Sequence, residues 1–384
     1  MPNAVRLATV VYHAARVTET SDRIGRFRAR ALAAPMTAFI GAVCLVAFIG
    51  TLGVCAAGSA QPVDVAVEAA WSLGSCRETL VRGGALELAR VWIDGEWWRV
   101  GTTGLLHGSL IHVTLNTWSL FSVGEWAERV WGAAGLLGLF VLSSVGGCLA
   151  SLAWAEAPMV VGASAGVLGI AGALLGARLA GDAETRNTLA PISVGMLGGC
   201  LAVLLLIGFF VPLIAQAGHL GGLGVGAILG VTWGHRGLGV RALGAVAALA
   251  VCAALVRAGR SPEGRPGFDE LVGYRLLEVG EFERASEALD RALEGRPDDP
   301  QLANAVAYSF AEARVALPRA RELVLRALDD EPDNADYLDT LGWIECQLGD
   351  TEAGLEALDR AAAAASTPIL EVTQHRAQCA SVAP

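Results

Sequence analysis

Seven apolar segments, each about 20 residues long, dominate the first two thirds of this 384-residue chain. They run at 36–58, 102–122, 133–153, 161–179, 190–211, 214–233 and 240–257. A helix needs about 20 apolar residues to cross a bilayer, and inside lipid the backbone must hydrogen-bond to itself. The sequence therefore predicts an all-α, polytopic membrane bundle over residues 36–258. The 54% hydrophobic content of the whole chain agrees with this prediction.

The first 35 residues contain six arginines and only two acidic residues. Positively charged segments beside a first span remain in the cytoplasm. We therefore expect residues 1–35 to be cytoplasmic, and an odd number of spans to put the C-terminus outside. The expected location is the lipid bilayer of a bacterial plasma membrane.

The last third of the chain differs in composition from the rest. After a linker rich in Pro, Gly and Arg at 259–266, residues 267–384 contain 24 acidic residues and 10 arginines. Ala292, Ala327 and Ala361 occupy equivalent places in stretches that recur every 34–35 residues. This period resembles that of the tetratricopeptide repeat, an antiparallel helix pair that stacks into a solenoid.

The repeat resemblance implies a soluble α-solenoid over residues 267–365, followed by a C-terminal tail at 366–384. Arrays of this kind bind peptides or partner proteins on their concave face, so a protein partner is expected. The alternative, that the repeats only cap or stabilise the chain, stays open. Neither part of the chain is basic enough to indicate nucleic-acid binding.

The eight cysteines are scattered, and no two have Cys-x-x-Cys spacing. In apolar segments cysteine behaves as a small hydrophobe, and five of the eight lie there: Cys44, Cys55, Cys148, Cys200 and Cys252. The other three, Cys76, Cys346 and Cys379, could pair in an oxidising compartment. Because the spacing fixes no pairing, we expect free thiols.

Polar side chains interrupt three of the apolar segments. His112 and Asn116 are four residues apart, so a helix projects both from one face. Ser164 stands among glycines and alanines, and His219 lies two segments later. Polar groups within spans indicate function because they are costly in hydrocarbon. For any one of them alone, a hydrogen bond between helices is the simpler explanation.

Small residues surround both Ser164 and His219. Gly162 lies in the same segment as Ser164, and Gly222 and Gly226 lie in the same segment as His219. Helix faces made of such small residues let two helices approach closely. If these faces pack together, His219 comes within hydrogen-bond reach of Ser164. A serine hydroxyl becomes a useful nucleophile when an adjacent base takes its proton, and a neutral imidazole is suited to that task.

No acidic residue lies inside these spans to orient His219, so a Ser–His dyad is expected rather than a triad. His112, Asn116 and the backbone N–H of Ser164 are the expected donors to an oxyanion. His107 lies five residues before His112, which is a poor spacing for two metal ligands on a helix, and no third ligand is in register. No metal and no cofactor are expected.

The order of these motifs resembles that of the rhomboid intramembrane serine proteases, over about residues 36–235. The resemblance rests on the stretches EWWRVGTTGLLHGSLIHVTLN, GEWAERVWG, GASAG and GHLGGLGVG. The matching residues are Trp98, Arg99, His107, His112, Asn116, Glu128, Arg129, Gly162, Ser164, His219, Gly222 and Gly226.

The rhomboid resemblance implies a bundle of six plus one helices. It also implies a serine endopeptidase that cleaves the transmembrane segments of single-pass membrane proteins. Ser164 and His219 would be catalytic, and His112 and Asn116 would stabilise the oxyanion. The resemblance gives structural roles to Trp98, Arg99, Gly162, Gly222 and Gly226, and to His107 the organisation of water or a loop.

Three positions depart from the family pattern. Leu168 stands where many members carry an aromatic ring that packs on the histidine, Ala165 where glycine is common, and Gly218 where alanine is common. None of these changes removes a reacting group. The Leu168 position does weaken the expected support of His219.

Two other readings stay open. An inactive rhomboid-like protein would bind membrane segments, or partners through its repeats, but inactive relatives usually lose the serine or the histidine, and this chain keeps both. A transporter or receptor-like bundle would carry charges along several spans, which this sequence does not.

Overall fold

The computed structural model describes residues 33–57, 67–68, 70–71, 76–154, 159–210, 215–259, 267–365 and 370–382. The chain divides into two compact units, Met1–Ser261 and Pro262–Pro384. Almost all of the basic segment expected at 1–35 and of the linker expected at 259–266 lies outside the described residues, as do the ends of the tail expected at 366–384.

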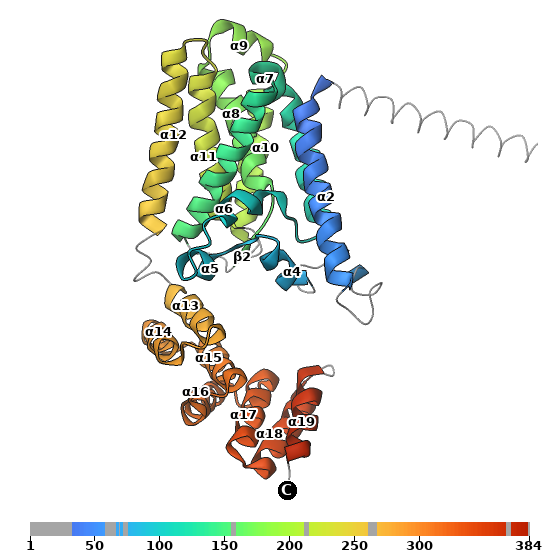
Figure 1. The fold of residues 1–384 in the computed structure, drawn as a ribbon, viewed down its shortest axis with the longest axis vertical. Helices are drawn as coiled ribbons and strands as arrows, with labels where there is room; N and C mark the ends of the chain where they lie inside the picture. Colours follow the sequence, from blue (N-terminus) through green and yellow to red (C-terminus); the bar gives the residue numbers. More distant parts are fainter. Residues whose placement is uncertain are drawn as a thin grey trace, which may run out of the picture. The chain divides into compact units, whose positions relative to one another are not determined.

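The first unit is a bundle of apolar helices (Figure 1). Its main helices are α2 (Pro35–Ala57), α7 (Leu110–Trp154), α8 (Ser164–Ala180), α10 (Val194–Phe210), α11 (Gln216–Trp233) and α12 (Leu238–Gly259). By length and apolar composition, α2, α7 and residues Leu238–Ala258 of α12 can cross a membrane, and α8 and α10 are shorter apolar helices. Since strands are almost absent from the described residues, the fold agrees with the expected all-α membrane bundle.

Helix α7 contains two of the predicted segments, 102–122 and 133–153. The backbone leaves helical geometry at Gly132, where φ is 69° and ψ is 178°, and the helix bends there. The predicted start at 102 is wrong, because α7 begins at Leu110. The preceding residues instead form the short helix α6 (Arg99–Thr102) and the 3-10 turn η2 (Thr103–Leu105). His107 therefore lies before α7, and its helical spacing from His112 does not apply.

Helices α8 and α11 pack through backbone rather than through side chains. A Cβ atom added at Gly222 would collide with the carbonyl of Ala165, and one at Gly226 would collide with the carbonyl of Gly169. The close approach of small-residue faces predicted from the sequence is therefore present in the structure. This contact fixes where the first turns of both helices lie.

A small polar layer covers the end of the bundle where α8 begins. It contains α4 (Arg77–Arg82), α5 (Leu88–Trp92), and the strands β1 (Leu86–Glu87) and β2 (Met159–Val160), which pair in antiparallel fashion. Arg99 is buried below this layer and donates to the carbonyls of Val81 and Ala85, the latter at 2.8 Å. An ion pair with Glu96 neutralises the charge of the buried Arg99 guanidinium.

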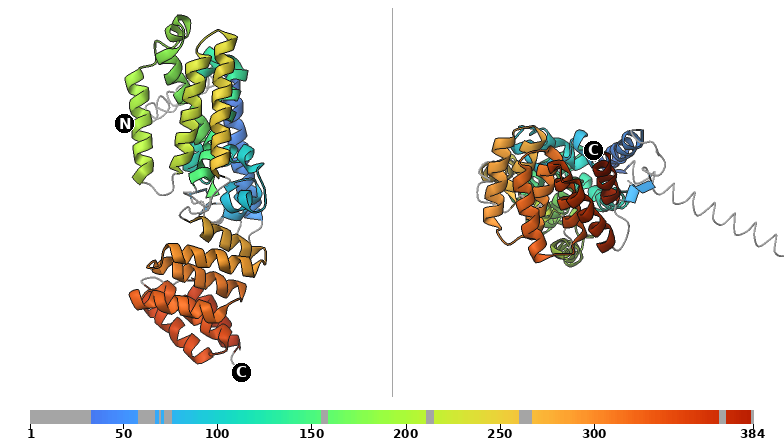
Figure 2. Two further views of the ribbon diagram at one scale, coloured as in Figure 1. Left: turned by 90° about the vertical axis from the view of Figure 1, so that its left-hand side faces the viewer. Right: turned by 90° about the horizontal axis from the view of Figure 1, so that it is seen from below.

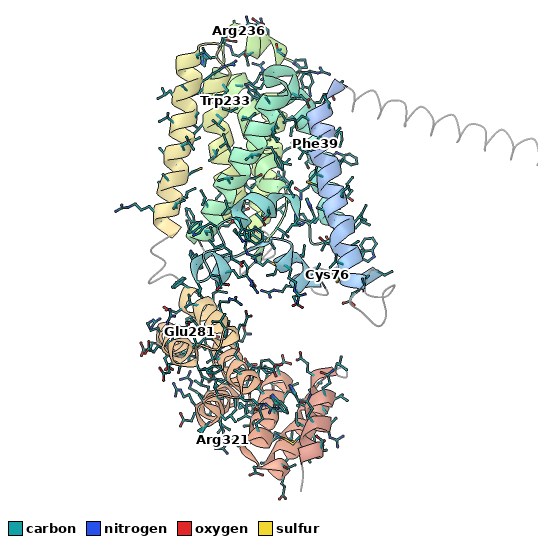
Figure 3. The ribbon with its side chains drawn as sticks, in the orientation of Figure 1. Phe39, Cys76, Trp233, Arg236, Glu281 and Arg321 are labelled. Carbon is teal, nitrogen blue, oxygen red and sulfur yellow. A yellow bond between two sulfur atoms is a disulfide. The ribbon has the colours of Figure 1, made fainter. Side chains whose placement is uncertain are left out.

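The two ends of the bundle differ in chemistry. Figure 3 shows Cys76 at one end of α2, and Trp233 and Arg236 toward the opposite end of the bundle. Near the start of α2, the buried carboxylate of Glu128 accepts hydrogen bonds from the N–H groups of Met36 and Thr37, at 2.9 and 3.0 Å. Helix α9 (Ala183–Thr188) follows α8 at the Arg236 end, and Arg236 pairs with Glu184 there.

The second unit consists of helices alone among its described residues, layered one on the next (Figure 2). They are α13 (Phe268–Glu278), α14 (Phe282–Gly295), α15 (Pro300–Ala313), α16 (Leu317–Asp330), α17 (Ala335–Leu348), α18 (Thr351–Ala364) and α19 (Leu370–Val382). Helices α14, α16 and α18 begin 35 and 34 residues apart, which is the period seen in the sequence. Assignment of these pairs to a particular repeat family stays a prediction.

Two disulfides correct the expectation of free thiols. Cys55 pairs with Cys76, and Cys346 pairs with Cys379. Cys55 was counted as a hydrophobic residue of the first segment, but it lies at the last turn of α2, beside the polar layer. The pairings depend on contacts between separate elements, which the spacing of cysteines in the sequence does not show. The cysteines that remain free are Cys44, Cys148, Cys200 and Cys252.

Candidate active site

Ser164 and His219 meet at the end of the bundle that the polar layer covers. Ser164 is the first residue of α8, and His219 lies in the first turn of α11. The Oγ atom of Ser164 lies 2.8 Å from Nε2 of His219. Because the glycine contacts between α8 and α11 hold the two helices together, this distance follows from the helix packing.

The Nε2 atom of His219 can accept the Ser164 proton only if the ring proton is on Nδ1. That Nδ1 atom is buried and has no hydrogen-bond partner among the described residues. No carboxylate in the described parts of the chain therefore orients the ring. Its position is held by the packing of α11 against α8 and α7.

His112 and Asn116 lie beside the backbone that leads into Ser164. A Cβ atom at Gly162 would lie 2.7 Å from the His112 ring and 3.7 Å from Nδ2 of Asn116. Gly162 also has a φ of 120°, which side chains rarely adopt. Glycine at this position therefore lets the polar face of α7 contact the chain two residues before Ser164.

Asn116 is buried, and one of its N–H groups donates to the carbonyl of His112 at 3.1 Å. The amide nitrogen carries two hydrogens, so a second donor remains. Both of the predicted oxyanion donors are thus brought toward the start of α8 by a single helix face.

His107 contacts the same loop at Ala163. Its ring is buried, with Nδ1 3.3 Å from the carbonyl of Leu105 and Nε2 3.5 Å from the N–H of Ala163. The His107 and His112 rings meet edge to face, with centroids 5.1 Å apart. His107 therefore contacts the residue before Ser164 through a backbone group.

Trp98 and Arg99 contact the end of α4 and the turn that follows it. The Arg99 guanidinium stacks on the Trp98 ring at 4.7 Å, and Trp98 is half exposed at the surface of the polar layer. The structure thus places these two residues in the loop scaffold. In the described part of the chain, no group of three or more His, Cys, Asp or Glu side chains is arranged to hold a metal ion.

Thr103 is a residue of this region that the sequence did not single out. Its hydroxyl donates to the carbonyl of Val160 at 2.5 Å and accepts from the N–H of Leu86, so it joins both strands. Its own carbonyl accepts from the N–H of Gly162 at 3.1 Å. The sequence signal for this role was the pair Thr102 and Thr103 at the start of the segment 102–122, which was predicted to be a membrane span.

Buried hydroxyls on α7 were also missed. Ser143 and Ser144 face Gly169 and Gly166 of α8, and Ser151 faces Gly218 of α11. None of these three hydroxyls has a hydrogen-bond partner among the described residues. The sequence signal was the presence of serines in the apolar segment 133–153, which indicates buried hydroxyls where α7 packs on α8 and α11.

The region that contains these residues has known relatives. Residues 94–236 match the family model of the Rhomboid domain. This match and the relatives below support the rhomboid family. The matched residues include Ser164, His219, His112 and Asn116.

The chain is 30% identical over 269 residues to the Rhomboid protease GluP of Bacillus subtilis, covering 68% of this chain and 51% of that protein. It is 32% identical over 158 residues to RHOMBOID-like protein 1 of Arabidopsis thaliana, covering 41% of this chain and 40% of that protein. The Rhomboid protease AarA of Providencia stuartii is 32% identical over 82 residues, covering 21% and 29%. The chain thus spans about half the length of these relatives or less.

Proposed function

We propose that this protein is an intramembrane serine endopeptidase that cleaves membrane proteins in or near their transmembrane segments. The observation that carries the proposal is the 2.8 Å distance between Ser164 Oγ and His219 Nε2. A serine hydroxyl within hydrogen-bond reach of an imidazole is the arrangement of an activated nucleophile. The names of the relatives GluP and AarA, both called rhomboid proteases, support the same activity.

The reaction proceeds by acyl transfer. His219 Nε2 takes the hydroxyl proton as Ser164 Oγ attacks the carbonyl carbon of the scissile peptide bond. The resulting imidazolium then gives this proton to the leaving amine as the C–N bond breaks. A water molecule, deprotonated by the same nitrogen, hydrolyses the acyl-enzyme and restores the serine.

The oxyanion of the tetrahedral intermediate needs donors close to Ser164. His112, Asn116 and the backbone N–H of Ser164 are assigned this role, since both side chains lie against the backbone at Gly162. Such donors act strongly in a site of low dielectric constant. His107 is assigned a positioning role through its contact with the N–H of Ala163.

The proposed orientation puts the N-terminus in the cytoplasm and the repeat unit outside, in a bacterial plasma membrane. Both disulfides support this, because disulfides persist in oxidising compartments and the cytoplasm keeps thiols reduced. The Cys55–Cys76 pair lies at the end of the bundle that holds Ser164, so water would reach the site from the outer face. The substrates are then single-pass proteins of the same membrane.

Labelling with a fluorophosphonate probe tests the Ser164 assignment. We expect the purified full-length protein to be labelled, and Ser164→Ala and His219→Ala to abolish labelling, because the probe reacts only with an activated serine. Ser122→Ala is the matched control, since Ser122 is an exposed serine whose hydroxyl donates to the Trp118 carbonyl of its own helix. Labelling should survive in that variant.

Absence of labelling in folded protein would contradict the protease proposal. It would favour the alternative, a rhomboid-like protein that binds membrane segments without cleaving them. Labelling that persists in Ser164→Ala would show that another serine reacts.

A further inference from the structure

The second unit contains a cavity of about 280 Å³ between α13 and α15. Tyr274 and Leu277 of α13 and Tyr308 of α15 supply much of its wall. Glu278 and Glu312 line it from the same two helices, and both carboxylates are exposed. The cavity thus combines aromatic sides with an acidic rim.

Tyr308 is supported from behind by rings of the next helices. The His375 ring of α19 lies 6.3 Å from the Tyr308 ring, and it stacks on Trp343 of α17 at 4.7 Å and 11°. Asp339 fixes His375 by a hydrogen bond of 2.9 Å to Nδ1. Asp339, Trp343 and His375 are buried, so they form a packed cluster behind Tyr308 that joins α15, α17 and α19.

Negative charge gathers around Tyr308 at the edge of the cavity. Glu278 is paired with Arg275 at 2.6 Å, whereas Glu312 and Glu371 form no ion pair among the described residues. Burial and the charges of Glu312, Glu371 and Asp339 raise the pKa of Tyr308 to about 12. Burial alone would lower the pKa of His375, but the hydrogen bond and charge of Asp339, together with Glu312 and Glu371, raise it. The charges around the cavity therefore favour a cation.

We propose that this cavity binds an arginine side chain of an extended protein segment, between Tyr274 and Tyr308. The aliphatic stem packs against Leu277, the guanidinium stacks on a tyrosine ring, and the rim carboxylate of Glu312 neutralises its charge. An anionic segment would be repelled by the carboxylate of Glu312, which forms no ion pair among the described residues. Arginine fits better than lysine because its planar group stacks on aromatic faces.

The wider charge of the unit supports a basic partner. Residues 267–384 carry 24 acidic residues against 10 arginines, so a positively charged segment is attracted from a distance before it reaches the cavity. The proposal concerns the second unit alone and does not depend on the peptidase function.

The test is a binding titration of full-length protein in detergent with fluorescein-labelled peptides of repeating Gly-Ser-Arg and Gly-Ser-Glu. We expect the arginine peptide to bind and the glutamate peptide not to bind. Tyr308→Ala should weaken binding about tenfold, since it removes the stacking face, and Glu312→Gln about threefold. Tyr308→Phe keeps the ring and should bind as the parent does.

Glu287→Gln on α14 is the matched control for charge, because Glu287 is exposed, lies outside the cavity and forms no ion pair among the described residues. It should leave affinity unchanged. Equal weakening by Glu287→Gln and Glu312→Gln would overturn the site in favour of diffuse attraction. Absence of binding by the parent, or equal binding of both peptides, would also overturn it, and unchanged thermal unfolding of Tyr308→Ala excludes loss of fold as the cause.

Discussion

His112 and Asn116 show how single residues of α7 reach the nucleophile. Both contact the chain at Gly162, a position that excludes any side chain because its φ is 120° and the imidazole lies within 2.7 Å of a Cβ atom. Spacing along the helix predicts that the two side chains share a face. Their contact with Gly162 depends on the fold of the loop that Thr103 holds.

We expect Asn116→Ala to slow fluorophosphonate labelling of Ser164 by about 10²–10³-fold, because one donor to the developing oxyanion is lost. The measurement is the second-order rate constant of labelling. Thr117→Ala is the matched control. Thr117 is the next residue of α7, and its hydroxyl donates to the carbonyl four residues earlier, at Val113, as the Asn116 amide does at His112. An Asn116→Ala rate equal to that of Thr117→Ala would remove Asn116 from the oxyanion site.

At the scale of elements, the contact between α8 and α11 decides whether the site exists. The two helices touch backbone to backbone at Gly222 and Gly226, so His219 is held one turn from that contact and faces Ser164. A helix with larger residues at these positions would stand farther away. Since nothing in the described chain other than Ser164 bonds the His219 ring, the helix packing carries the geometry.

Alanine substitutions on α11 should separate packing from helix propensity. Gly226→Ala is expected to lower the free energy of unfolding by about 1–3 kcal/mol, because its Cβ collides with the Gly169 carbonyl. Gly224→Ala on the same helix meets nothing within 4 Å and should stabilise by up to about 1 kcal/mol. Thermal unfolding in detergent measures both, and equal effects would contradict the packing account.

For the whole molecule, the disulfides relate the fold to the membrane. Cys55–Cys76 closes the loop that follows α2, and Cys346–Cys379 ties α19 to α17. The four free cysteines lie in α2, α7, α10 and α12 of the membrane unit. Disulfide pairing is therefore confined to the regions that the proposed topology puts outside.

Thiol trapping tests this topology. Cells are quenched with acid, the protein is denatured, and free thiols are modified with a maleimide polymer before or after reduction. We expect four modified cysteines before reduction and eight after, and Cys346→Ser/Cys379→Ser should reduce only the second number, by two. Six modified cysteines before reduction in the parent, and four in that double variant, would put the repeat unit in the cytoplasm.

Apolar length and helical spacing are local properties, so they were enough to predict the apolar helices, apart from the start of α7, and the residues that could react. Ser164, His219, His112 and Asn116 were all recognisable in this way, as was the 34–35-residue period. The tertiary structure decided the 2.8 Å approach of serine and histidine, the start of α7 at Leu110, the disulfide pairs and the cavity beside Tyr308. These features join residues distant in the chain, so they depend on how helices pack and loops close, which local patterns do not specify.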